Sequence, residues 1–108
     1  MALDFHIGDN QKEASYQNSD ASFDFELHRL LFTQLGLTAT EFPLFTRLED
    51  YYSDTKFNID ELVFLMDETD QVKALLSEHD AFTQPLDKLL LVCEKALKEK
   101  VSIWVFCD

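Results

Sequence analysis

The fold is decided by Val101-Ser102-Ile103-Trp104-Val105-Phe106-Cys107, the clearest strand in the sequence. β-Branched and aromatic side chains favour strands over helices. Both faces of this strand are apolar apart from Ser102, which is typical of an inner strand that is covered on both sides. We therefore predict that residues 101–107 lie in the middle of a small sheet.

A strand that can pair with residues 101–107 is found at the other end of the chain. Apolar and polar side chains alternate in Leu3-Asp4-Phe5-His6-Ile7, as they do in a half-buried strand. We expect these two strands to pair, in an orientation that the sequence leaves open. Turn residues follow at 8–11, and residues 13–18 can return as the second strand of a hairpin.

Asp4 and His6 share one face of the first strand, because side chains two residues apart point the same way. Such a pair can do acid–base chemistry. It can equally be the polar face of an edge strand, and we favour this second interpretation.

Two helices are predicted between residue 20 and residue 52. The first can begin at Ser22 or Asp20, which are good N-caps, and Gly36 can end it. Its apolar stripe has the spacing of one helical face: Phe23, Leu27, Leu30, Leu31 and Leu35. The second helix can begin at Thr40, and its apolar and aromatic side extends to Tyr52.

Two more helices are predicted after a connection at residues 53–57. Asn58 and Glu61 have the spacing of a capping box, so the third helix begins there and is expected to run to about His79. The fourth helix opens at Pro85, a residue that is favoured in the first helical turn. It ends in a lysine-rich turn before the last strand.

These elements predict an α+β fold in one domain over residues 1–108. The sheet is expected to have two or three strands, made of the N-terminal strand or hairpin and the C-terminal strand, with about four helices packed on it. One hundred and eight residues are enough for one hydrophobic core.

The chain carries a strong negative charge. Twenty-one acidic residues stand against nine basic ones, for a net charge of −12. This excludes nucleic acid and anionic membranes as favoured partners, because both are bound through clustered Lys and Arg. Basic proteins and cations remain as possible partners.

The charge is concentrated in residues 41–80, which hold eleven acidic and three basic residues, for a net charge of −8. We predict a docking face for a basic protein partner here, because opposite charges speed association and aromatic anchors are common at interfaces. The residues predicted to bind the partner are Glu49, Asp50, Tyr51, Tyr52, Asp54, Asp60, Glu61, Asp67, Glu68 and Asp70.

Two other interpretations of the chain remain open. The acidic residues can be a solvated face that keeps the protein soluble. Alternatively, the chain is a structural or regulatory domain that acts as a homo-oligomer, with a homodimer as the simplest form. Apolar residues that can form such an interface are Phe25, Phe32, Trp104 and Phe106.

The sequence contains no motif that indicates an enzyme, a cofactor or a metal site. It lacks a glycine-rich phosphate loop, and its three histidines and two cysteines do not have zinc-ligand spacing. Cys93 and Cys107 are too few for a disulfide framework. The N-terminus lacks the basic and apolar regions of a signal peptide, so we expect a cytoplasmic protein.

One segment is similar to a known group of proteins. Phe42-Pro43-Leu44-Phe45-Thr46-Arg47-Leu48-Glu49-Asp50-Tyr51-Tyr52-Ser53-Asp54 resembles a segment of small acidic bacterial proteins, the immunity-type proteins of polymorphic or contact-dependent toxin systems. Those proteins also begin with a short strand and end with a strand after a Lys-rich helix. The resemblance implies a stoichiometric inhibitor of a toxin. Nuclease toxins are basic, so an acidic protein can cover their phosphate-binding sites.

Overall fold

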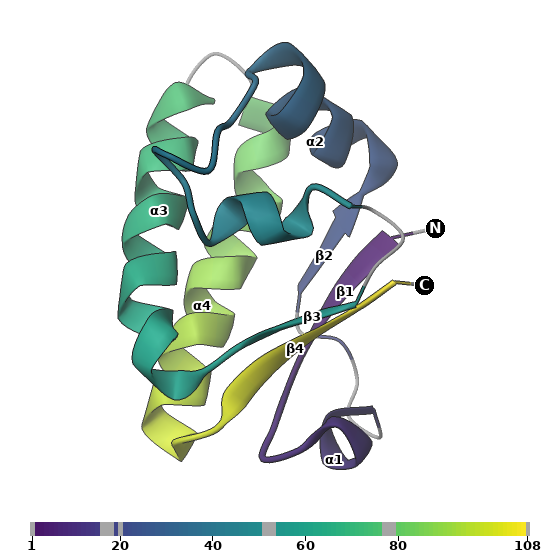
Figure 1. The fold of residues 1–108 in the computed structure, drawn as a ribbon, viewed down its shortest axis with the longest axis vertical. Helices are drawn as coiled ribbons and strands as arrows, with labels where there is room; N and C mark the ends of the chain where they lie inside the picture. The colour runs from purple at the N-terminus through teal and green to yellow at the C-terminus, as the bar shows by residue number, and fades with distance from the viewer. Residues whose placement is uncertain (1, 16–18, 20, 51–53, 77–79, 108) are drawn as a thin grey trace.

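The protein is a twisted antiparallel sheet packed against helices, as the predicted α+β class requires (Figure 1). The computed structural model describes residues 2–15, 19, 21–50, 54–76 and 80–107. Within them the sheet has four strands in the order β2-β1-β4-β3, which are β1 (Ala2–Gly8), β2 (Ala21–Asp24), β3 (Thr55–Phe57) and β4 (Ser102–Cys107).

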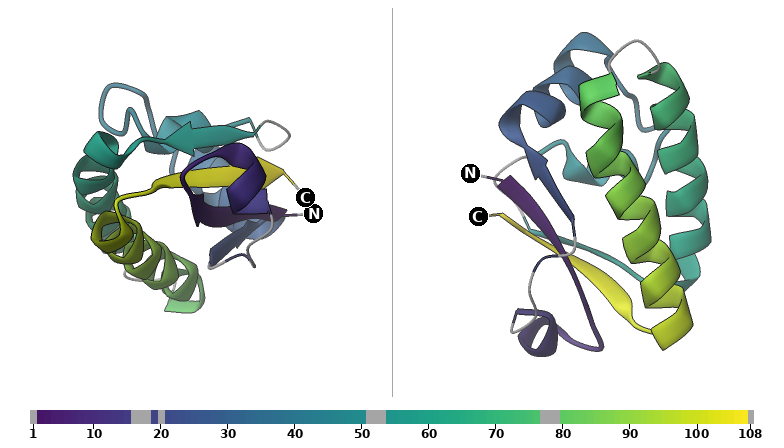
Figure 2. Two further views of the ribbon diagram at one scale, coloured as in Figure 1. Left: turned by 90° about the horizontal axis from the view of Figure 1, so that it is seen from below. Right: turned by 180° about the vertical axis from the view of Figure 1, so that it is seen from behind.

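The two strands predicted at the chain ends form the centre of this sheet. β1 and β4 pair antiparallel, from Leu3 opposite Cys107 to Gly8 opposite Ser102. The pairing brings the two termini side by side, as Figures 1 and 2 show. The inner position predicted for the last strand is therefore confirmed.

Because β1 is also an inner strand, the edge-strand interpretation of Asp4 and His6 is wrong. Asp4 Oδ1 accepts a hydrogen bond from Ser22 Oγ of β2 at 2.8 Å. The His6 ring packs against Phe106 of β4, with 5.1 Å between the ring centroids. Both side chains thus interact with a neighbouring strand.

The second strand of the sheet is β2, which lies later in the chain than the hairpin strand predicted at residues 13–18; residues 16–18 are outside the described part of the chain. Residues 11–15 form the short helix α1 (Gln11–Ser15), in which Asn10 Oδ1 accepts a hydrogen bond from the Glu13 amide at 2.8 Å. In β2, Ala21 and Phe23 are buried while their neighbours are exposed, so these residues extend the sheet. The apolar residues Phe23 and Leu27, which have helical spacing, therefore lie in a strand and in the helix that follows it.

The first long helix consequently starts later than predicted. Asp24 is its N-cap, with Oδ1 accepting from the Leu27 amide at 2.9 Å. Of the two N-caps predicted, Ser22 lies in β2, and Asp20 is outside the described residues. α2 (Phe25–Arg29) continues as a π-helical turn (Leu30–Gln34). Gly36 follows in the left-handed conformation, with φ +64°, which confirms the predicted end of the helix.

The second predicted helix is the main error in the expected layout. The described part of that region contains a 3₁₀ turn (Phe45–Leu48) and no α-helix. Residues 55–57, expected as a connection, form β3 instead. Phe57 pairs with Ile103 of β4 and is fully buried, so burial of this side chain favours the strand. β3 is the reason that the sheet has more strands than predicted.

The capping box at Asn58 and Glu61 is confirmed, with the Asn58 amide donating to Glu61 Oε1 at 2.9 Å. A 3₁₀ turn (Ile59–Glu61) leads into α3 (Leu62–Leu75). The predicted end near His79 lies outside the described residues. A further 3₁₀ turn (Asp80–Phe82) leads into α4 (Thr83–Glu99), which begins two residues before Pro85.

α3 and α4 lie side by side, and α4 packs against β1, β2 and β4 (Figure 2). The core between helices and sheet contains four fully buried phenylalanines: Phe5, Phe23, Phe45 and Phe57. α3 buries one side in this arrangement and turns the other toward solvent. No helix in the described ranges is both long and apolar enough to cross a bilayer.

Candidate functional site

α3 and the turn before it expose a continuous stripe in which acids alternate with large apolar side chains. We call this stripe the α3 outer face; it consists of Asp60, Val63, Phe64, Asp67, Asp70, Gln71 and Leu75. The members recur at intervals of three and four residues, so they share one side of the helix. Val63 is 60% exposed and Phe64 is 66% exposed. A face that serves only solubility does not need large exposed hydrophobic residues.

A groove of about 420 Å³ runs along this face, between α3 and the segment that leads into the 3₁₀ turn at residue 45. Figure 1 shows that this segment passes beside α3. The groove combines apolar and acidic side chains, and its lining residues are Glu41, Pro43, Leu44, Glu61, Phe64, Asp67, Glu68 and Gln71.

Glu68 fixes the inner wall of the groove. Its side chain is only 6% exposed, and its carboxylate accepts hydrogen bonds from the backbone of the facing segment. The Leu44 amide donates to Oε1 at 3.1 Å and Oε2 at 3.2 Å, and the Phe45 amide donates to Oε1 at 3.0 Å. Glu68 was predicted to contact a partner, but its burial gives it a structural role instead.

Glu61 lies at one end of the groove in an ion pair with Arg47. Arg47 Nη1 donates to Glu61 Oε1 at 3.1 Å, and the Arg47 guanidinium lies 5.6 Å from the centroid of the Phe57 ring. The hydrogen bond from Arg47 lowers the pKa of Glu61 below its ordinary value and raises the pKa of Arg47. The charge of Glu61 is therefore largely balanced within the chain.

Asp67 and Glu41 are the remaining carboxylates of the groove, and both are exposed. Asp67 Oδ2 accepts one hydrogen bond from Gln71 Nε2 at 3.0 Å. An ionised carboxylate has room for about four such bonds. Asp67 can therefore still accept a donor from a ligand in the groove.

The other predicted residues do not join this stripe. Glu49 and Asp50 are exposed after the 3₁₀ turn. Asp54 Oδ1 accepts from the Cys107 amide at 2.8 Å, so this side chain holds the end of β4. In the chain, these three residues lie between the 3₁₀ turn and β3, outside α3 and the turn that leads into it. Tyr51 and Tyr52 lie outside the described residues.

The acidic residues of 41–80 therefore form two groups rather than one face on two helices. The group on α3 and the 3₁₀ turn before it (Asp60, Asp67 and Asp70) is accompanied by exposed apolar residues and a groove. In the ranges that the structure describes, no group of three His, Cys, Asp or Glu side chains is arranged to hold a metal ion.

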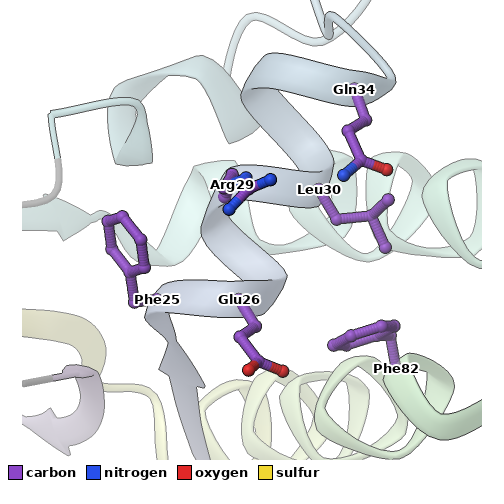
Figure 3. A pocket seen from close by; sticks show the side chains of 6 residues that line it. All are labelled: Phe25, Glu26, Arg29, Leu30, Gln34 and Phe82. Atoms are coloured by element: carbon purple, nitrogen blue, oxygen red, sulfur yellow. The ribbon is translucent and has the colours of Figure 1, made fainter.

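A second hollow of about 260 Å³ lies beside α2. Figure 3 shows Glu26, Gln34 and Phe82 on one side of the helix and Phe25 on the other. One acid and one base, Glu26 and Arg29, leave this hollow without a dominant charge. It consequently gives no indication of the chemistry of a ligand.

The cysteines do not form a disulfide, and Cys93 is not an activated nucleophile. Burial raises the pKa of the Cys93 thiol to about 12, so the thiol stays protonated at neutral pH. Thiol nucleophiles act as thiolates. Cys93 is instead part of the hydrophobic core.

Sequence reasoning missed the apolar members of the candidate site. Val63 and Phe64 fall off the buried stripe of α3, which contains Leu62, Leu65 and Val72. Placing the helix on a wheel from its capping box would have put Phe64 on the same side as Asp60 and Asp67. Glu41 and Pro43 join them in the folded chain, where Glu68 binds the amides of the neighbouring residues Leu44 and Phe45.

Comparison of the chain with protein-family models, with curated proteins and with solved structures finds no match in any of the three.

Proposed function

We propose that this protein is a non-enzymatic binding protein that neutralises a basic protein partner through the α3 outer face. The observation that carries the proposal is the combination on one helix of exposed acids with exposed Val63 and Phe64. Aromatic anchors supply affinity at interfaces, and surrounding charges steer the encounter. The α3 outer face contains both.

The whole-chain charge supports the same partner chemistry. A net charge of −12 repels other acidic surfaces and attracts basic ones at long range. A standard interface takes about 800 Å² from each partner. The α3 outer face extends over 14 helical residues and, with the groove beside it, offers a surface along the full length of α3.

In its most specific form, the partner is a bacterial toxin and the protein is its immunity factor. The likeness of residues 42–54 to immunity-type proteins favours this form. Neutralisation by coverage is stoichiometric and requires neither a cofactor nor a reaction. The predicted contacts are Asp60, Asp67 and Asp70, with Glu49 and Asp50 as peripheral contributors.

Charge reversal tests the proposed function. The partner is first captured from native lysate at low salt and released at high salt. Its association with a variant carrying Asp60→Lys and Asp70→Lys is then measured by stopped flow. We expect the association rate to fall at least about tenfold at low salt, because steering depends on the local field.

A matched control separates local charge from net charge. Glu94→Lys with Glu99→Lys makes the same change in net charge on α4, where both residues are exposed. This control should retain most of the association rate. Equal slowing by both double variants would overturn the assignment of the binding face to α3.

Self-association is a second candidate function, and one observation favours it. Leu91 on α4 is 63% exposed beside a hollow that also contains Lys88 and Lys95. The two lysines have the opposite charge to the acids of the α3 outer face, so this hollow in one copy can dock on the α3 outer face of another. Sedimentation equilibrium at low salt distinguishes a dimer from the monomer that the first proposal expects.

A further inference from the structure

We infer that the groove beside α3 is an arginine slot, which receives one arginine side chain of the basic partner. The inference rests on the proposed function and names its central contact. The groove has the features that a long side chain with a charged end requires: apolar walls, acidic rims and a volume of about 420 Å³. Ligand sites in proteins span about 300–1,000 Å³.

The apolar walls match the stem of the side chain. Phe64 lies on the α3 side, and Pro43 and Leu44 lie on the facing side. Arginine buries its three methylene groups along apolar surface while its guanidinium stays near polar groups. Phe64 is 66% exposed, so a stem that packs on its ring covers a large apolar surface.

The acidic rims match the guanidinium. Of the four carboxylates that line the groove, Glu61 is paired with Arg47 and Glu68 is bound to backbone amides. Glu41 and Asp67 are exposed and retain capacity for donors. The charge that the chain leaves uncompensated in the groove thus comes from these two residues, one on each side.

Charge alone does not select arginine over lysine, but an aromatic wall with a carboxylate beside it favours arginine. A guanidinium is planar, stacks on aromatic rings and bonds carboxylates with two parallel hydrogen bonds. An ammonium group is compact and more strongly hydrated.

The chain itself contains this arrangement next to the groove. Arg47 lies over the Phe57 ring at 5.6 Å while its guanidinium binds Glu61. Phe64 with Asp67 offers a second ring with a carboxylate on the same helix, three residues apart. We expect the partner's arginine to adopt the same combination of ring contact and ion pair there.

A synthetic probe tests the slot without the natural partner. The probe is the blocked peptide Ac-Gly-Ser-Arg-Ser-Gly-NH₂, titrated into the full protein and followed by ¹H–¹⁵N NMR. We expect amide shifts at Leu44, Phe64 and Gln71. The same peptide with citrulline, a neutral isostere of arginine, should bind at least about tenfold more weakly, and the lysine peptide should bind more weakly than the arginine peptide.

Variants in the groove and matched variants elsewhere locate the binding. Phe64→Ala and Asp67→Asn should each weaken the arginine peptide severalfold. Phe25→Ala on α2 and Glu94→Gln on α4 remove an exposed aromatic ring and an exposed charge from outside the groove and the α3 outer face, and should leave its affinity unchanged. Circular dichroism checks that all four variants are folded.

The slot is overturned if the shifts fall elsewhere, if citrulline or lysine binds as well as arginine, or if the control variants weaken binding as much. It is also overturned if sedimentation shows a dimer and the Leu44, Phe64 and Gln71 amides shift with protein concentration, since a second copy then occupies the groove.

The charge-reversal experiment with the natural partner is a separate readout. If the Asp60 and Asp70 substitutions slow association of that partner but the peptide does not bind in the groove, the arginine slot is wrong and the proposed function stands. If the peptide binds but charge reversal has no effect, the proposed function fails.

Discussion

The carboxylate of Glu68 supplies hydrogen-bond acceptors for two backbone amides of another segment. Its oxygens accept the amide hydrogens of Leu44 and Phe45 from a segment that has no α-helical partners of its own. A buried amide that lacks a partner costs about 1–3 kcal/mol. One side chain of α3 therefore determines the path of the facing segment and, with it, one wall of the groove.

The first prediction concerns this residue. Glu68→Ala leaves two buried amides without acceptors, so the free energy of unfolding should fall by about 2–4 kcal/mol. Asp67→Ala, one residue away and exposed, should change it by less than about 1 kcal/mol. Urea unfolding monitored by circular dichroism measures both. Similar losses in the two variants would contradict the structural role of Glu68.

The second prediction concerns the ion pair of Glu61 with Arg47. Because the hydrogen bond from Arg47 lowers the pKa of Glu61 below 4.5, the folded state holds its proton less tightly than the unfolded state. The pair therefore stabilises the fold above pH 4.5, and this contribution disappears as the pH falls through the lowered pKa. Both side chains are partly solvated, so it amounts to about 1 kcal/mol or less.

Urea unfolding of Glu61→Gln between pH 7 and pH 3 tests whether the stabilisation by the ion pair is lost at acid pH. The variant should be less stable than the wild type at pH 7, and the difference should shrink at acid pH. Glu94→Gln on α4 should differ from the wild type by less than about 0.5 kcal/mol throughout. A difference for Glu61→Gln that grows on acidification would show that the sign is wrong.

At the scale of elements, α4 ends in a strained residue. Lys100 adopts the left-handed conformation, with φ 59° and ψ 46°, where its amide bonds the carbonyls of the last helical turn. Glycine is favoured at this position because a Cβ atom costs about 1–2 kcal/mol in that conformation. The conformation is retained because β4 must start at Ser102 directly after the helix.

The third prediction follows from this strain. Lys100→Gly should stabilise the protein by about 0.5–1 kcal/mol, since relief of strain exceeds the added freedom of the unfolded chain. Glu99→Gly, one residue earlier and still helical, should destabilise it by up to about 1 kcal/mol. Thermal unfolding of both variants measures these opposite changes in stability. Destabilisation by Lys100→Gly would mean that its side chain contributes more than the strain costs.

Elements with strong local signals were predictable, and those held by tertiary contacts were not. β1, β4, the capping box and the turn at Gly36 follow from alternation and cap chemistry within a few residues. β2 and β3 are short strands whose ladders depend on β1 and β4. A four-residue strand beside a helix can be mistaken for its first turn, and Phe57 in β3 is informative only once Ile103 is known to lie beside it.

In the candidate site too, the features that depend on tertiary contacts could not be predicted from the sequence. Acidic residues and their concentration were visible in the sequence, and Asp60, Asp67 and Asp70 do share the α3 outer face. Spacing could not show that Glu68 turns inward or that Asp54 holds Cys107. It also could not place Glu41 beside Phe64, since these residues meet only after the chain has folded.

At the scale of the whole molecule, the charge distribution acts against folding and in favour of binding. Net charge far from zero destabilises a compact state through self-repulsion. Residues 41–80 hold two-thirds of the excess, and several of their carboxylates share the α3 outer face. A protein without a use for this face would be more stable with fewer acids there.

The fourth prediction is that salt changes stability and binding in opposite directions. Between 10 and 150 mM NaCl the screening length falls from about 30 Å to about 8 Å. Repulsion among the acids is then screened, so the free energy of unfolding should rise; a gain of 1 kcal/mol corresponds to about 4 °C or more in Tm at this size. Association with the basic partner should slow over the same range, because steering is screened as well.

A variant with Glu49→Gln, Asp67→Asn and Asp70→Asn tests whether the two effects of salt come from the same acidic residues. It removes both repulsion among the acids and attraction to the basic partner. Its Tm and its association rate should therefore both depend less on salt than those of the wild type. If salt slows association as steeply in this variant as in the wild type, the attraction comes from other parts of the molecule. If the wild-type Tm falls with salt, favourable ion pairs such as Arg47 with Glu61 outweigh the repulsion, and the acidic face then imposes no stability cost that binding must explain.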